Sequence, residues 1–169
     1  MNTHIIKSNF DFLGKKVLIM GLGLNGGGVG IAKFFAKKGA QVSVTDLKNQ
    51  QVLTRSIEQL KNYKIKFILC KHNKQDFIDN EIIIKGAGIK WDNHYIQTGI
   101  KNRRIIDTDI GIFFEIAQNP KIGITGSKGK STTTILMHKI FQQKYNSAKL
   151  GGNIAVSPFE QFDEHDHES

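Results

Sequence analysis

Cysteine is almost missing from this 169-residue chain, and long apolar runs are missing altogether. The lone Cys70 excludes a disulfide within the chain, which suits a reducing compartment, and it follows an apolar run that predicts a buried strand residue. No run approaches the ~20 apolar residues of a membrane span, and the polar first eleven residues lack the apolar core of a signal peptide. We therefore expect a soluble globular protein of the cytoplasm, without a membrane partner.

Arginine is also scarce, because only three of the 24 basic residues are arginines although the formal net charge is +9. An arginine-rich stripe interleaved with aromatic residues, which is typical of nucleic-acid platforms, does not occur. The lysines are scattered along the chain, which favours a solvated lysine-rich surface with modest attraction for anionic ligands. We expect no nucleic-acid partner and a monomeric protein.

Short apolar runs alternate with helical patterns over the first 117 residues. Near-continuous apolar runs are typical of strands buried on both faces, and they occur at residues 15–20, 41–45, 66–69, 81–84 and 104–106. Helical spacing of apolar residues separates or follows these runs, at 31–38, 51–63, 95–100 and 110–117. Gly39 is the candidate end of the first of these helices. Strands that alternate with helices predict an α/β fold with a parallel sheet covered on both faces.

A second unit begins after the dipeptide Asn119-Pro120, which marks a domain boundary. We predict a first domain over residues 1–119 and the start of a second α/β domain over 120–169. The second comprises one strand–loop–helix–strand unit, with a helix from about 130 to 143 and strands at 122–125 and near 148–150. Such a unit is too small to bury its own core. We therefore expect a truncated second domain whose polar tail, 159–169, is disordered.

A glycine-punctuated loop between an apolar run and a helical pattern is the most informative motif, Ile124-Thr125-Gly126-Ser127-Lys128-Gly129-Lys130-Ser131-Thr132. Free backbone N–H groups and a helix N-terminus suit the phosphates of a nucleotide. Lys130 would supply charge to the terminal phosphates and the Ser131 hydroxyl could ligate Mg²⁺. The usual P-loop needs a glycine where Ile124 stands, so the pattern here is the shorter Thr-Gly-x-x-Gly-Lys-Ser.

A second glycine loop, Gly21-Leu22-Gly23-Leu24-Asn25-Gly26, follows the first predicted strand. With Asp46 twenty residues past Gly26, it matches the dinucleotide fingerprint. Further glycines at 27, 28 and 30 make this loop longer and looser than the tight dinucleotide turn. An NAD-dependent oxidoreductase also needs no second phosphate loop. It stays an alternative, which protection by NADH but not by UDP-sugars would favour.

Together these motifs resemble the Mur ligases, the ATP-dependent amino-acid ligases of peptidoglycan precursor synthesis, and among them the branch that adds D-glutamate. The resemblance spans about residues 15–158 and is carried by both glycine loops, Val44-Thr45-Asp46, Thr108-Asp109-Ile110-Gly111-Ile112-Phe113 and Gly151-Gly152-Asn153-Ile154. It implies a Rossmann-like domain that binds the UDP end of the substrate, followed by the start of a central P-loop-type ATP-binding domain. This sequence departs from the family pattern at three positions. Lys128 stands where the family usually has asparagine, Ala87 where it often has proline, and Gly111 where an acidic residue is common.

Residue roles follow from the same resemblance. Leu24, Asn25 and Gly26 would approach the diphosphate or uridine. The uracil pocket would be lined by Asp46, Leu47 and Lys48, and closed by the loop that holds Gly88. Asn153 would reach the substrate from the central domain. The ATP site would comprise Gly126, Ser127, Lys128, Gly129, Lys130, Ser131 and Thr132, with Lys130 as the catalytic cation and Ser131 on Mg²⁺.

The reaction implied by the resemblance joins D-glutamate to UDP-N-acetylmuramoyl-L-alanine with ATP and Mg²⁺. ATP phosphorylates the substrate carboxylate, and the amine of D-glutamate then displaces phosphate. The family's later magnesium ligands and its amino-acid-binding domain are not in these 169 residues, so we expect an N-terminal fragment that is inactive alone. A non-catalytic nucleotide-binding module is the remaining alternative.

Overall fold

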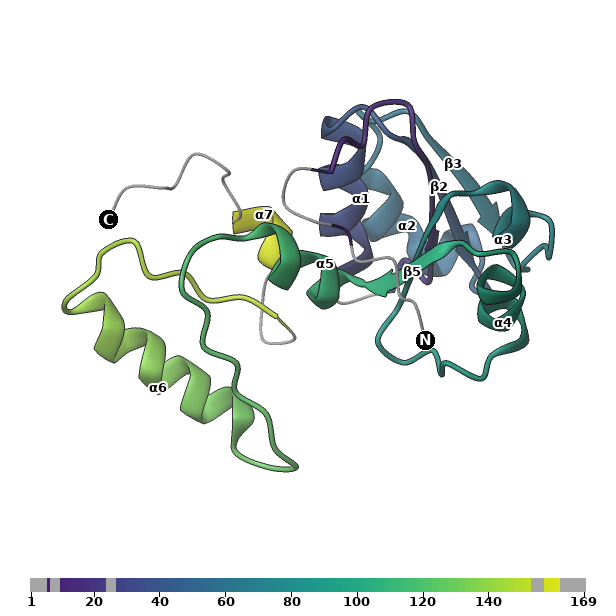
Figure 1. Cartoon of the computed structure of the whole chain (residues 1–169). Coiled ribbons are helices and arrows are strands. Elements are labelled where there is room, and N and C mark those ends of the chain that lie inside the picture. The colour runs from purple at the N-terminus through teal and green to yellow at the C-terminus, as the bar shows by residue number, and fades with distance from the viewer. Residues whose placement is uncertain (1–5, 7–9, 24–26, 153–156, 162–169) are drawn as a thin grey trace.

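The computed structural model describes residues 6, 10–23, 27–152 and 157–161 (Figure 1). A five-stranded sheet lies at its centre, with the strands in the order β3-β2-β1-β4-β5 and every neighbouring pair parallel. The strands are β1 (Lys16–Met20), β2 (Gln41–Asp46), β3 (Ile65–Leu69), β4 (Ile82–Lys85) and β5 (Ile105–Thr108). The predicted α/β fold with a parallel sheet is therefore confirmed.

Helices cover both faces of the sheet (Figure 1). α1 (Gly27–Lys37) and α2 (Gln50–Glu58) lie on one face, while α3 (Asp76–Asp79) and α4 (His94–Lys101) lie on the other. α5 (Asp109–Ile116) follows β5 directly. Gly39 ends α1 as predicted, with a φ of 77° and its N–H on the Ala36 carbonyl. α3 had no counterpart in the sequence prediction, because four residues are too few to show a helical period.

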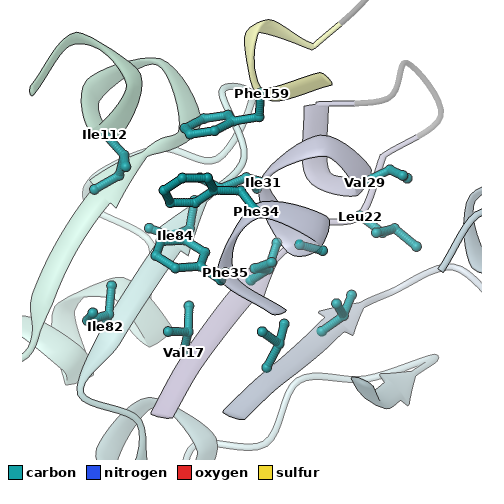
Figure 2. Close-up of a cluster of buried hydrophobic side chains, with 14 of the residues drawn as sticks. Val17, Leu22, Val29, Ile31, Phe34, Phe35, Ile82, Ile84, Ile112 and Phe159 are labelled. Atoms are coloured by element: carbon teal, nitrogen blue, oxygen red, sulfur yellow. The ribbon is translucent and has the colours of Figure 1, made fainter. Parts of the chain in front are cut away.

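The apolar side chains of the strands alternate between two cores. Val17 and Ile19 of β1 pack in the larger core with α1, whereas Leu18 and Met20 belong to the smaller core with Phe77. Figure 2 shows the larger core, in which Phe34 and Phe35 of α1 lie over the sheet. Strands buried on both faces have apolar residues at successive positions, which explains why the apolar runs predicted them.

Three expectations differ from the structure. Cys70 is exposed and has a φ of 64°, because the chain turns immediately after β3. Residues 122–125 and 148–150 form no strands in the described part of the chain, since a strand needs a hydrogen-bonded neighbour that neither finds. Of the tail expected to be disordered, residues 159–161 lie in α7 (Pro158–Gln161), and residues 162–169 lie outside the described part of the chain.

α7 ties the end of the described chain to the sheet domain. Phe159 is only 8% exposed, and its ring lies 4.9 Å from that of Phe34 (Figure 2). Lys33 of α1 forms an ion pair with Glu160 at 3.3 Å. α6 (Lys130–Gln142) forms over the predicted residues but has no buried residue, and it stands apart from the sheet (Figure 1).

None of the helices in the described residues combines the length and the apolar character that a membrane crossing needs.

Candidate functional site at the carboxyl edge of the sheet

A pocket of ≈ 610 Å³ opens at the carboxyl ends of the strands, where the connections from β1 and β4 leave in opposite directions. In open parallel sheets this reversal of strand order is where ligands bind. The pocket receives residues from the loops after β1, β2, β3 and β4, from the start of α5, and from the segment before α7. Among them are Gly21, Leu22, Gly23, Asp46, Leu47, Lys48, His72, Lys85, Gly86, Gly88, Asp109 and Ser157.

The glycine loop after β1 depends on glycine at specific positions. Gly21 and Gly23 have φ values of 88° and 69°, in the left-handed region that favours glycine. Gly28 has a different role, because a Cβ there would lie 2.3 Å from the Leu22 carbonyl oxygen. The start of α1 can therefore pack directly on the loop backbone, which brings the helix N-terminus to the pocket.

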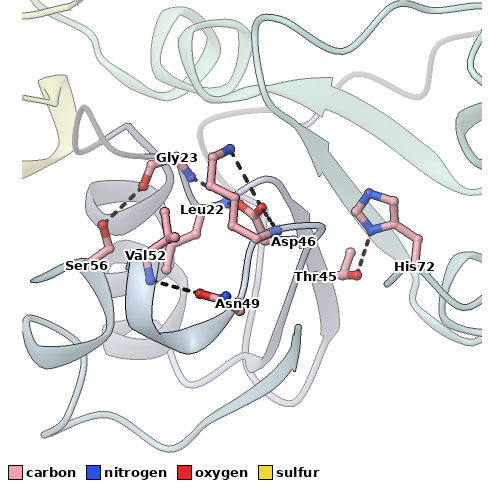
Figure 3. Close-up of polar contacts among 9 residues, drawn as sticks. Leu22, Gly23, Thr45, Asp46, Asn49, Val52, Ser56 and His72 are labelled. Carbon is pink, nitrogen blue, oxygen red and sulfur yellow. Dashed lines mark hydrogen bonds and ion pairs between the residues drawn. The ribbon is translucent and has the colours of Figure 1, made fainter. Parts of the chain in front are cut away.

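Asp46 holds this loop in place (Figure 3). Its Oδ2 accepts hydrogen bonds from the Leu22 N–H at 2.9 Å and the Gly23 N–H at 3.4 Å, while Oδ1 accepts from the Lys48 N–H at 2.9 Å. The residue is only 4% exposed. Ser56 of α2 adds a bond to the Gly23 carbonyl at 3.1 Å. The Asp46 carboxylate is thus committed to the loop backbone, which argues against a role as a free ribose ligand.

His72, in the loop after β3, forms a hydrogen bond with Thr45 near the end of β2 (Figure 3). The Thr45 hydroxyl lies 3.0 Å from the Lys71 carbonyl and 2.8 Å from His72 Nδ1. One hydroxyl proton can serve only one acceptor, so both bonds form when Thr45 donates to Lys71 and His72 Nδ1–H donates to Thr45. Burial lowers the pKa of His72 below 6.5, with Asp46 opposing and His94 adding to the shift. A neutral His72 therefore retains a lone pair on Nε2.

The lowered pKa of His72 predicts that the protein loses stability in mild acid. Well above pH 6.5 the imidazole is neutral whether the chain is folded or unfolded. As the pH falls below that value the unfolded chain takes up the proton more readily, so the free energy of unfolding decreases. Urea denaturation at pH 7 and pH 5 should show a smaller loss for His72→Asn, which keeps a donor but does not titrate. The control His138→Asn, on α6, should match the wild type, and an unchanged loss in His72→Asn would contradict the prediction.

Asp107 packs against Gly111, the glycine that stands where the resembled family commonly has an acidic residue. A Cβ at Gly111 would lie 1.9 Å from Asp107 Oδ1, so the Asp107 carboxylate fills the space beside this glycine. Burial raises the pKa of Asp107, while the Thr108 N–H and the charge of Lys85 act in the opposite direction. An acidic side chain at 111 would be incompatible with Asp107 in this position.

The second glycine loop lies away from this pocket, because none of residues 126–132 lines it. Gly129 has a φ of 77° and precedes α6, and Lys130 Nζ donates to the Gly126 carbonyl. Ser131 is an exposed residue in the first turn of α6. Exposed N–H groups at a helix start, a lysine ammonium and a hydroxyl are the donor set that suits the phosphates of ATP and one magnesium position. The described residues contain no cluster of three or more His, Cys, Asp or Glu side chains for a metal.

The structure brings together four of the predicted substrate residues, since Asp46, Leu47, Lys48 and Gly88 all line the pocket. Four others, Leu24, Asn25, Gly26 and Asn153, lie outside the described residues. His72, Lys85 and Asp109 also line the pocket, although no sequence pattern predicted them there. Lys85 is a polar residue that ends an apolar strand at the carboxyl edge of the sheet. Asp46 was predicted as a site residue from the same kind of position, which could therefore have predicted Lys85 as well.

Comparison with known proteins gives a consistent result. Residues 15–106 match the family described as "Mur ligase MurD-like, N-terminal domain". Two relatives are named UDP-N-acetylmuramoylalanine–D-glutamate ligase. The protein from Borreliella burgdorferi (strain ZS7) is 44% identical to this chain over 90% of its length, and the protein from Roseiflexus sp. (strain RS-1) is 36% identical over 88%. These alignments cover 33% and 32% of the relatives, so the chain spans about a third of their length.

A solved structure, that of a pseudomurein peptide ligase type C from Methanothermus fervidus, is 23% identical with a TM-score of 0.48, over 84% of this chain and 32% of that one. The family match covers more than half of the chain, including the glycine loop, Asp46 and Lys85. This chain therefore belongs to the Mur ligase family, in which it matches the N-terminal domain of the MurD-like members.

Proposed function

We propose that the pocket binds the UDP end of UDP-N-acetylmuramoyl-L-alanine, and that the chain forms part of an ATP-dependent, ADP-forming ligase that adds D-glutamate to it. The names of the relatives support the reaction. One observation supports the binding role above all. Asp46 holds the glycine loop in place, and the loop backbone and the N-terminus of α1 face a pocket at the reversal of strand order.

The proposal assigns separate tasks to two parts of the chain. Residues 1–119 would hold the UDP-linked substrate, and residues 120–169 would contribute the ATP loop of a central domain. Lys130 would bind the terminal phosphates and Ser131 would ligate Mg²⁺, while ATP supplies the phosphoryl group that activates the substrate carboxylate. Fixed positive charge beside a transferring phosphoryl group lowers the barrier to its transfer. Both ATP and UDP-linked precursors are cytoplasmic, so we place the reaction there.

Calorimetric titration of the 169-residue chain tests the substrate class. UDP-N-acetylmuramoyl-L-alanine and UDP should bind, whereas NADH should not. Binding of NADH alone would overturn the proposal and favour an oxidoreductase. Because these residues span about a third of the relatives, we expect no D-glutamate-dependent ADP release from them alone. Detectable turnover would contradict that part of the proposal.

The ATP loop has its own test. Replacing Lys130 by alanine removes the charge at the start of α6, and we expect the affinity for ATP–Mg²⁺ to fall at least tenfold, about the effect of losing one charge-assisted hydrogen bond. Lys139→Ala is the matched control, because it removes an exposed lysine from the same helix. Affinity for UDP should be unchanged in both variants. Equal ATP affinity in Lys130→Ala and Lys139→Ala would exclude Lys130 from the site.

A further inference from the structure

Lys85 is the one lysine or arginine side chain that is buried among the described residues. It ends β4 at the reversal of strand order, is 4% exposed and lines the pocket. Its Nζ donates to the Ile89 carbonyl at 2.8 Å and lies 4.9 Å from the centre of the Trp91 ring. Within the described residues, no carboxylate oxygen lies within ion-pair distance of it.

The hydrogen bonds of Lys85 are therefore incomplete. An ammonium group has three donors, and the protein occupies one of them with Ile89. The Trp91 ring offers favourable electrostatics but no lone pair. Asp46, the pocket carboxylate nearest the glycine loop, already accepts three backbone N–H groups. The charge of Lys85 reaches the Asp107 carboxyl, but the two form no ion pair in the described part of the chain. A buried cation without an ion-pair partner is costly, and an anion that enters the pocket would relieve that cost.

The surrounding backbone holds the ammonium group in a defined position. The Gly86 N–H donates to the Met20 carbonyl at 2.9 Å, and the Ile89 N–H donates to the Gly86 carbonyl at 3.0 Å. The Ile89 side chain covers the glycine loop, with its Cδ1 3.6 Å from where a Cβ of Gly21 would lie. Lys85 thus lies where the turn after β4 meets the loop after β1, at the pocket that the N-terminus of α1 also borders.

We propose that Lys85 is a specificity-determining residue that binds the diphosphate of the nucleotide-linked ligand in this pocket. This inference rests on the proposed function for the identity of the ligand, although the diphosphate chemistry can be tested without it. A lysine ammonium is a compact charge suited to phosphate oxygens, and charge-assisted bonds in a partly dehydrated pocket are the stronger ones.

Calorimetric titration of Lys85→Met with UDP and with uridine tests this role. The methionine fills the space of the lysine stem, so the buried site remains packed. We expect at least a tenfold loss of affinity for UDP, less than a twofold change for uridine, and a weaker dependence of UDP binding on salt. Lys85→Arg should recover most of the UDP affinity. Lys90→Met, which removes an exposed charge from the same turn, should behave as the wild type.

Equal losses for UDP and uridine would overturn the proposal, because they would mean that Lys85 only supports the turn after β4. Urea denaturation checks whether Lys85→Met is folded. If it is unfolded, Lys85→Arg and Lys85→Gln are titrated instead, and the ratio of UDP affinity to uridine affinity again decides. If wild-type protein bound neither UDP nor uridine, the proposed function would fail. Titration with inorganic pyrophosphate would then test the role of Lys85 alone. The role is supported if the wild type binds pyrophosphate at least tenfold more tightly than Lys85→Met, and it is overturned if the two bind pyrophosphate equally.

Discussion

Alanine in place of Gly28 should lower the free energy of unfolding by about 3 kcal/mol, the upper end of the usual cost of overpacking. The new Cβ would lie 2.3 Å from the Leu22 carbonyl oxygen and 2.8 Å from two further Leu22 backbone atoms. None of these atoms belongs to a flexible side chain, so α1 or the glycine loop must move. Alanine favours a helix by about 1 kcal/mol over glycine, which is too little to offset the clash.

Urea denaturation followed by far-UV circular dichroism measures this change. Gly123→Ala is the matched control, because Gly123 has no atom within 4 Å of the added Cβ and no positive φ. Its stability should stay within about 0.5 kcal/mol of the wild type, as for most surface substitutions. If Gly28→Ala were equally stable, the close packing of α1 on the loop would be incorrect.

Replacing Asp46 by alanine should have a comparable effect, a loss of about 3 kcal/mol, together with weaker UDP binding. The variant leaves the backbone N–H groups of Leu22, Gly23 and Lys48 without their acceptor. Each hydrogen bond to a charged group contributes about 1.5–3 kcal/mol, but the three share one carboxylate and will not add fully. Asp46→Asn should lose less, since one oxygen remains as an acceptor.

The same denaturation experiment checks this prediction, with Asp92→Asn as a control for the loss of an exposed carboxylate. The outcome also separates two roles for Asp46. A residue that only binds a ribose could be replaced with little change in stability, whereas a residue that holds the loop could not. A loss of less than about 0.5 kcal/mol in Asp46→Ala would favour the ribose role.

Local patterns predicted most of the sheet domain correctly. Each predicted strand between residues 15 and 106 overlaps an observed one, because strands buried on both faces need apolar residues in succession. Local patterns did not predict structure correctly where a segment needs a neighbouring strand or helix to contact. Residues 122–125 have the apolar character of a strand, but backbone hydrogen bonds to a neighbouring strand are a property of the assembled sheet, and none forms there in the described chain. The burial of Phe159 was not predicted for a similar reason, since it depends on contact with Phe34 of α1.

By itself, the sequence determined the parallel α/β class, the two glycine loops, and the place of Asp46 after a strand, since each of these depends on residues close together in the chain. Only the tertiary structure decided what these residues contact. The Asp46 carboxylate binds the loop that precedes it by more than twenty residues, and Thr45 meets His72 across the ends of two strands. Lys85 joins the same pocket because β4 lies beside β1 in the sheet. The carboxyl ends of parallel strands converge only when the sheet forms, so sequence spacing could not predict these contacts.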